Sequence, residues 1–181
     1  MAATVSKLAA VVYPDGDLHG ETADAVVLAF CHGLQHLGWQ VGGLTQRRVP
    51  APGGGKPALE LVDLRSGAAH PVSQNLGPHA QGCSIDAGRV ADASRVLRQA
   101  LHDRVQLAVT NRFGELEAGG GGFAAEIAGL AGAGIPVLTI AAPKHLEAWR
   151  RFTGGEGDEL PARAAALRDW FMLAAEKRAP A

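Results

Sequence analysis

Short apolar runs alternate with amphipathic helical segments along this chain, and no other sequence feature constrains the fold as much. The runs at 8–13, 105–109 and 137–141 each contain no more than one polar side chain. A strand that is apolar on both faces must be covered on both faces, as happens when helices connect parallel strands. The sequence therefore predicts an α/β fold with three layers and a mostly parallel sheet.

Helices are predicted where apolar residues recur at intervals of three or four. One of them begins near Thr22. Its predicted inner face consists of Val26, Phe30, Leu34 and Leu37. A second helix follows Asp86, whose carboxylate can cap its first turn, and it runs to about Leu101.

An antiparallel hairpin is inserted into this alternation. Segments 58–64 and 69–72 flank a turn of Arg-Ser-Gly, and residues 46–57 before them are predicted as a loop because they are rich in proline and glycine. No repeat or linker divides the 181 residues. A single domain over 1–181 is therefore predicted, with 153–181 as a C-terminal helical extension.

The charge balance and the cysteine content exclude several classes of protein. A net charge of -1 argues against a general nucleic-acid binder, which would show a basic surplus. The two cysteines, Cys31 and Cys83, lack Cys-x-x-Cys spacing, so a reducing compartment is expected. The apolar run at 8–13 is too short to predict a signal peptide, and no run approaches the length of a membrane span, so a cytoplasmic protein without membrane insertion is predicted.

Polar side chains follow the central apolar run, where a predicted strand ends. In open α/β sheets, ligands bind at the carboxyl ends of the strands. The predicted ligand-binding residues at these ends are Thr45, Arg47, Ser73, Gln74, Asn111, Arg112 and Lys144. Their cationic, hydroxyl and amide groups suit a small tetrahedral anion. The alternative is that the cations lie on a solvated surface, while Ser73 and Gln74 satisfy turn backbone.

Two acidic residues and two histidines are weaker candidates. Glu115 and Glu117 are general bases if the chain is an enzyme, and otherwise they form an exposed acidic turn or partners for Arg112. His32 and His36 have the spacing of a metal-binding pair, but no third ligand accompanies them. The sequence therefore predicts no side chains that bind a metal ion.

The order of these pieces resembles the small thermophilic-type nucleoside triphosphatases, a branch of the P-loop NTPases, over residues 7–142. The segments that carry this resemblance are 37–45, 62–67, 82–86 and 109–117. The chain resembles still more a family of uncharacterised bacterial proteins often encoded beside molybdate transport genes. The segments shared with that family are 44–47, 72–74, 111–115 and 146–152.

The chain departs from the P-loop NTPase pattern where that pattern binds ATP. The motif Gly-x-x-x-x-Gly-Lys-Ser/Thr aligns with residues 15–22, so that Asp15 replaces the first glycine and Glu21 replaces the lysine. Like charges ~4 Å apart near a protein surface repel by about 4 kcal/mol. Asn111 and Arg112 stand where that family has Asp-Glu. ATP and magnesium are therefore not expected to bind in the usual mode, which argues against an enzyme.

The resemblance and the residues together predict an oxyanion-binding protein on a degenerate P-loop NTPase scaffold. The family context implies molybdate or tungstate, hence a metal-oxyanion ligand, and a link to a molybdate transport system. One alternative is a divergent magnesium-dependent nucleoside triphosphatase that uses Glu115 or Glu117. The other is a non-catalytic scaffold or regulatory subunit, with the apolar last helix as the contact of a homo-oligomer.

Overall fold

Strands and helices alternate along most of the chain in the computed structural model, which describes residues 6–51, 56–74 and 85–176. In chain order the elements are β1 (Leu8–Val12), α1 (Glu21–His36), β2 (Val41–Val49), β3 (Ala58–Asp63), β4 (Ala69–Pro71), α2 (Ala87–His102), β5 (Leu107–Phe113), α3 (Glu115–Ala118), α4 (Ala124–Gly132), β6 (Val137–Ala141), the 3-10 turn η1 (Pro143–His145), α5 (Leu146–Phe152), β7 (Asp158–Pro161) and α6 (Ala164–Glu176).

The strands form one sheet in the order β4-β3-β2-β5-β6-β1-β7. The pairs β2–β5, β5–β6, β6–β1 and β1–β7 are parallel. β3 pairs antiparallel with both β2 and β4. This arrangement confirms the predicted α/β fold, with a mostly parallel sheet of P-loop-NTPase-like type and an antiparallel hairpin.

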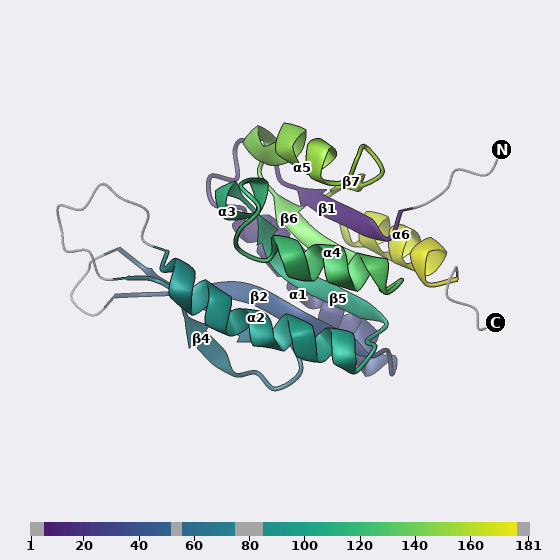
Figure 1. The fold of residues 1–181 in the computed structure, drawn as a ribbon, viewed down its shortest axis with the longest axis horizontal. Coiled ribbons are helices and arrows are strands. Elements are labelled where there is room, and N and C mark those ends of the chain that lie inside the picture. The colour runs from purple at the N-terminus through teal and green to yellow at the C-terminus, as the bar shows by residue number, and fades with distance from the viewer. Residues whose placement is uncertain (1–5, 52–55, 75–84, 177–181) are drawn as a thin grey trace.

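Helices cover the sheet on both faces (Figure 1). α2, α4 and α5 pack on one face, where their apolar residues include Leu97, Ile127 and Trp149. α1 and α6 pack on the other, where Val27 and Phe171 are fully buried. The strand β1 lies between β6 and β7 and sends side chains into both cores, which explains why its sequence is apolar throughout.

The second strand extends further than the sequence predicts. Residues 46–49, predicted as part of a loop, continue β2 and pair with β3. Only residues 41–44 of β2 pair with β5, so the outer half of β2 belongs to an antiparallel arm formed with β3 and β4. Its cross-strand partners hold these polar residues in an extended conformation, which local sequence does not indicate.

The polar cluster after the central apolar run lies within a strand and not beyond it. β5 continues to Phe113, and its register with β6 shifts between Val109 and Arg112. Asn111 at this irregularity has a left-handed backbone with φ of 59°. Asparagine tolerates that conformation better than most residues because its short amide can hydrogen-bond locally.

The C-terminal segment contributes a strand that the sequence reading missed. β7 pairs in parallel with β1 and closes one edge of the sheet, so 153–176 is not purely helical. α6 then docks as expected, through the buried residues Leu167, Trp170, Phe171 and Ala174. Residues 177–181 of the predicted extension lie outside the described residues, and the division into domains stays a prediction.

Candidate functional site

The loop between β1 and α1 carries an anion site that the chain fills with its own carboxylate. Asp17 accepts hydrogen bonds from the backbone N–H groups of Glu21 at 3.0 Å and Thr22 at 3.1 Å, at the start of α1. Free N–H groups and the helix dipole make such a terminus a binding site for phosphate. In this chain Asp17 occupies the donors that a phosphate would use.

The guanidinium of Arg112 lies across the same loop. Its Nη2 donates to the carbonyl oxygens of His19 at 2.7 Å and Gly20 at 3.3 Å, and its central carbon lies 5.2 Å from the centre of the Tyr13 ring. Gly20 has a left-handed backbone with φ of 66°, and a Cβ there would lie 2.7 Å from Nη1 of Arg112. The glycine therefore makes room for the guanidinium.

A chain of hydrogen bonds connects Arg112 to the end of β2. Arg112 donates to Asp24 at 2.7 Å, Gln46 donates to the same carboxylate oxygen at 3.2 Å, and Asn111 donates to the amide oxygen of Gln46 at 3.2 Å. Burial raises the pKa of the Asp24 carboxyl above its ordinary value of 3.8, and the positive charge of Arg112 opposes this shift. The network thus balances a partly buried carboxylate against one guanidinium.

Three consecutive residues beside this network hold buried polar atoms without a partner among the described residues. These atoms are Thr110 Oγ1, Asn111 Oδ1 and Arg112 Nε. Buried polar groups are nearly always hydrogen-bonded, so such atoms mark a place where water or a ligand completes the structure. The end of β5 is therefore the candidate site.

The structure brings together only part of the predicted binding residues. Asn111 and Arg112 are linked through Gln46 and Asp24, as described above. Thr45, next to Gln46 in β2, is buried. Arg47 is exposed and pairs with Glu60 of β3 at 2.8 Å, outside the network.

Ser73 and Gln74 lie beyond β4, three strands away from β5. At the usual spacing between strands this separation is about 14 Å. Both side chains bond to backbone: Ser73 Oγ accepts from the N–H of Leu59 at 2.6 Å, and Gln74 donates to the carbonyl of Ile85 at 3.2 Å. The two residues therefore do not reach an anion that touches Arg112.

Lys144 and the two glutamates surround the end of β6. Lys144 is exposed on η1. Burial, together with the charge of Lys144, lowers the pKa of His145, and the carboxylates of Glu115 and Glu117 oppose this shift. Glu115 is exposed, whereas Glu117 is buried.

Glu117 serves as a structural cap. Its carboxylate accepts from the backbone N–H of Gly114 at 2.9 Å and of Phe123 at 3.0 Å. These bonds fix the start of α3 and the glycine-rich turn that follows it. Both oxygens are therefore engaged.

The sequence reading did not place Asp17, Asp24 and Gln46 in the site. Asp17 carried a signal, because it lies four residues before the first position of a helix whose N-terminus would bind phosphate. Gln46 stands at a predicted strand end, but nothing in the sequence favoured it over its neighbours, and Asp24 carried no signal. Both join the network of Arg112 only through the packing of α1 and β2 at the end of β5.

Other candidates lie elsewhere. His32 and His36 are exposed on α1, and within residues 6–51, 56–74 and 85–176 no three His, Cys, Asp or Glu side chains are grouped as a metal ion would require. Burial raises the pKa of the Cys31 thiol to about 12, while Cys83 lies outside the described residues. In the described part of the chain, no helix combines the length and apolar character needed to cross a membrane.

Residues 8–170 match the family described as "Protein of unknown function (DUF2478)". The chain belongs to this family. No solved structure matches it.

One curated relative carries a functional name. The chain is 36% identical over 167 residues to the "Molybdenum import ATP-binding protein ModC 2" of Bradyrhizobium diazoefficiens. The matched stretch is 92% of this chain but only 18% of the relative. This DUF2478 chain thus spans less than a fifth of the relative's length, and the relative supports its P-loop-NTPase-like relationship.

Proposed function

We propose that this DUF2478 protein binds a small oxyanion on a P-loop-NTPase-like scaffold and does not hydrolyse nucleotides. One observation carries the proposal: Asp17 and Arg112 occupy the loop in which an NTPase holds its triphosphate. A nucleotide would have to displace both groups, and Glu21 would add a charge of the wrong sign.

The end of β5 is the proposed binding position. Among the described residues, the buried Nε–H of Arg112 has no hydrogen-bond partner, and neither has the buried hydroxyl of Thr110. Both groups donate hydrogen bonds, which suits an oxyanion. Lys144, exposed beyond β6, adds positive charge at the same edge of the sheet, whereas Arg47, Ser73 and Gln74 have other roles in this proposal.

Molybdate, or its analogue tungstate, is the oxyanion that we favour. The support comes from the name of the relative, which is a molybdenum import protein. The partly buried carboxylate of Asp24 opposes any dianion near Arg112. Binding must therefore be accompanied by neutralisation of Asp24 or by movement of the guanidinium toward the anion.

Isothermal titration calorimetry with molybdate and with ATP–magnesium tests the proposal. The expected result is saturable binding of molybdate by the wild type and none of ATP–magnesium. Arg112→Ala should weaken molybdate binding by about tenfold or more, equivalent to about 1.4 kcal/mol. Asn111→Gly should also weaken molybdate binding, because it removes the amide side chain. Glycine adopts the left-handed backbone at that position readily, so the strand should keep its conformation.

A matched control is Arg150→Ala, which removes another ion-paired arginine, on α5. It should bind molybdate as the wild type does. Equal affinity of wild type and Arg112→Ala would show that the site is placed wrongly. Release of phosphate from ATP that depends on Glu115 would favour the rival proposal, a divergent triphosphatase.

The relative favours a second role, as a regulatory partner of a molybdenum importer. In the relative the matched stretch is part of a much longer chain, so a separate copy can act on an import ATP-binding protein. Copurification of the two proteins, with and without molybdate, tests this role. Met172 and Leu173 are exposed on α6 and form the proposed contact of a homo-oligomer, which the native mass would reveal.

A further inference from the structure

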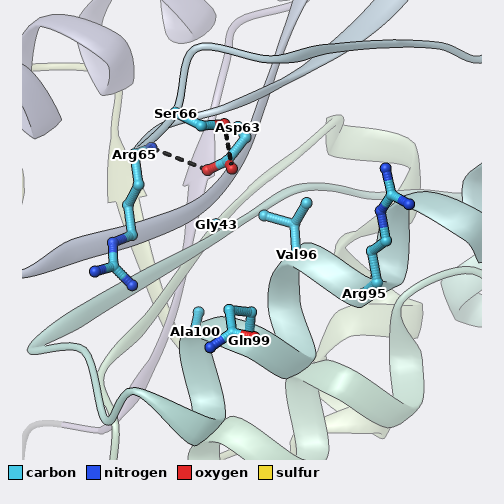
Figure 2. A pocket seen from close by; sticks show the side chains of 8 residues that line it. All are labelled: Gly43, Asp63, Arg65, Ser66, Arg95, Val96, Gln99 and Ala100. Carbon is cyan, nitrogen blue, oxygen red and sulfur yellow. Dashed lines mark hydrogen bonds between the residues drawn. The ribbon is translucent and has the colours of Figure 1, made fainter.

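A pocket of about 590 Å³ lies between α2, the start of β2 and the turn that joins β3 to β4 (Figure 2). None of its lining residues belongs to the candidate site at the end of β5. Its volume falls in the range of pockets that bind small molecules, about 300–1,000 Å³. Neither the fold nor the comparisons assign it a ligand.

Two arginines stand on opposite sides of this pocket. Figure 2 shows Arg65 on the side of the turn and Arg95 on α2, with Gly43 and Val96 between them. Arg95 has no hydrogen-bond or ion-pair partner within residues 6–51, 56–74 and 85–176. Arg65 contacts Asp103, which does not line the pocket. The guanidinium of Arg95 is therefore available to a ligand.

The carboxylate in the pocket is already engaged. Asp63 accepts from the backbone N–H of Arg65 at 2.9 Å and from the hydroxyl of Ser66 at 2.6 Å. Both of its oxygens thus stabilise the turn, as the dashed lines in Figure 2 mark. Arg65 is neutralised by its ion pair with Asp103, which leaves Arg95 as the guanidinium of the lining that has no ion-pair partner among the described residues.

The floor of the pocket is apolar and open. Val96 and Ala100 present aliphatic groups from α2, and Gly43 presents bare backbone. Gly43 has φ of 111°, and a Cβ there would lie 2.0 Å from the carbonyl oxygen of Val109. Only glycine fits at this position, because the backbone of β5 approaches β2 closely there.

We propose that this pocket binds an organic phosphomonoester, with its phosphate on Arg95 and its organic body against Val96 and Ala100. A guanidinium pairs two N–H groups with two phosphate oxygens, which suits the phosphate group of such a ligand. The apolar floor gives the ligand's body contact area that inorganic phosphate lacks.

Calorimetry on the full chain tests this proposal with AMP and glucose 6-phosphate as probes, and with adenosine and inorganic phosphate as comparators. At least one phosphomonoester should bind saturably. Adenosine and inorganic phosphate should each bind with an affinity at least about tenfold lower. Arg95→Ala should reduce the affinity by a similar factor. Val96→Trp should do so as well, because it fills the pocket and keeps both arginines.

The control is Arg98→Ala, one turn along α2, where Arg98 pairs with Glu126 at 3.1 Å outside the pocket. It should bind the probe as the wild type does, and circular dichroism should show all three variants folded. The proposal is overturned if neither phosphomonoester binds, or if Arg95→Ala retains full affinity. Equal binding of adenosine or of inorganic phosphate would also overturn it.

Discussion

The guanidinium of Arg112 lies 2.7 Å from a carboxylate oxygen of Asp24, and the two side chains are only 20% and 19% exposed. The pair joins the end of β5 to the first turns of α1. The attraction between two partly buried charges of opposite sign offsets the desolvation free energy that each charge would otherwise leave uncompensated. This pair therefore fixes the start of α1 against the end of β5.

Removal of Arg112 should destabilise the fold. Arg112→Ala leaves Asp24 without its cation, and we expect the free energy of unfolding to fall by about 2–3 kcal/mol, as for the loss of hydrogen bonds to a charged group. Urea denaturation measures this loss. Arg150→Ala, which breaks an exposed ion pair with Glu159, should cost less than about 1 kcal/mol. Equal losses in the two variants would contradict the role assigned to Arg112.

A double-mutant cycle separates the pair from its surroundings. Asp24→Asn removes the buried negative charge, so Arg112→Ala should cost less in that background than in the wild type. A coupling free energy of about 1 kcal/mol or more between the two positions is expected. Additive losses would mean that Arg112 stabilises the loop through His19 and Gly20 alone.

The pKa of Asp24 predicts how stability depends on pH. Its pKa is raised in the folded protein by burial, from an ordinary value of 3.8. An acid with a raised pKa contributes its stability below pH 3.8, and this contribution is lost as the pH rises through the folded value. Relative to Asp24→Asn, the wild type should therefore lose stability over that window. Unfolding titrations at several pH values measure the difference, and a gain for the wild type would show that Arg112 outweighs burial.

The local pattern of apolar and polar residues was sufficient to predict the parallel part of the sheet. The apolar runs of β1 and β6 are buried on both faces, and Asp86 caps α2 by accepting from the N–H of Arg89 at 3.1 Å. The face of α1 was predicted in part. Leu34 is buried, and Val26 and Phe30 pack against the core while partly buried. The centre of the buried face is the neighbouring row of Ala23, Val27 and Cys31, and Leu37 is 78% exposed.

Features that depend on partners distant in sequence could not be read locally. Residues 46–48 form a strand because β3 pairs with them. Similarly, Asn111 and Arg112 could be placed at a strand end from sequence, but their contacts with Gln46 and Asp24 arise from the packing of β2 and α1. Arg47 and Ser73 lie away from Arg112 because they belong to the antiparallel arm of β2, β3 and β4. This arm extends beyond the part of the sheet in which β2 pairs with β5.

Gly20 should tolerate no side chain. Gly20→Ala puts a Cβ at φ of 66°, 2.7 Å from Arg112 Nη1 and 2.8 Å from the Tyr13 ring. A loss of about 1–3 kcal/mol in the free energy of unfolding is expected from backbone strain and displacement of these groups. Gly16→Ala in the same loop meets nothing within 4 Å, and its effect should stay within about 0.5 kcal/mol. Comparable effects of the two substitutions would contradict this geometry.

Glu117 should matter for stability and not for chemistry. Glu117→Ala leaves the buried N–H of Phe123 and the N–H of Gly114 without an acceptor, which should cost about 2–3 kcal/mol in thermal or urea unfolding. Glu115→Ala, at an exposed position of the same helix, should change the free energy of unfolding by less than about 0.5 kcal/mol. A stable Glu117→Ala protein that loses a nucleotide phosphatase activity would instead assign Glu117 to catalysis.

Restoring a free, positively charged loop should restore affinity for nucleotide. The double substitution Asp17→Ala and Glu21→Lys frees the N–H groups at the start of α1 and supplies the lysine of a phosphate-binding loop. Removing the like charge at ~4 Å is worth about 4 kcal/mol, so calorimetry should detect ATP–magnesium binding at least tenfold tighter than in the wild type. The charge-matched control is Asp169→Ala with Glu156→Lys, both exposed and remote from the loop. If the control gains as much affinity, net charge and not the occupied loop excludes ATP.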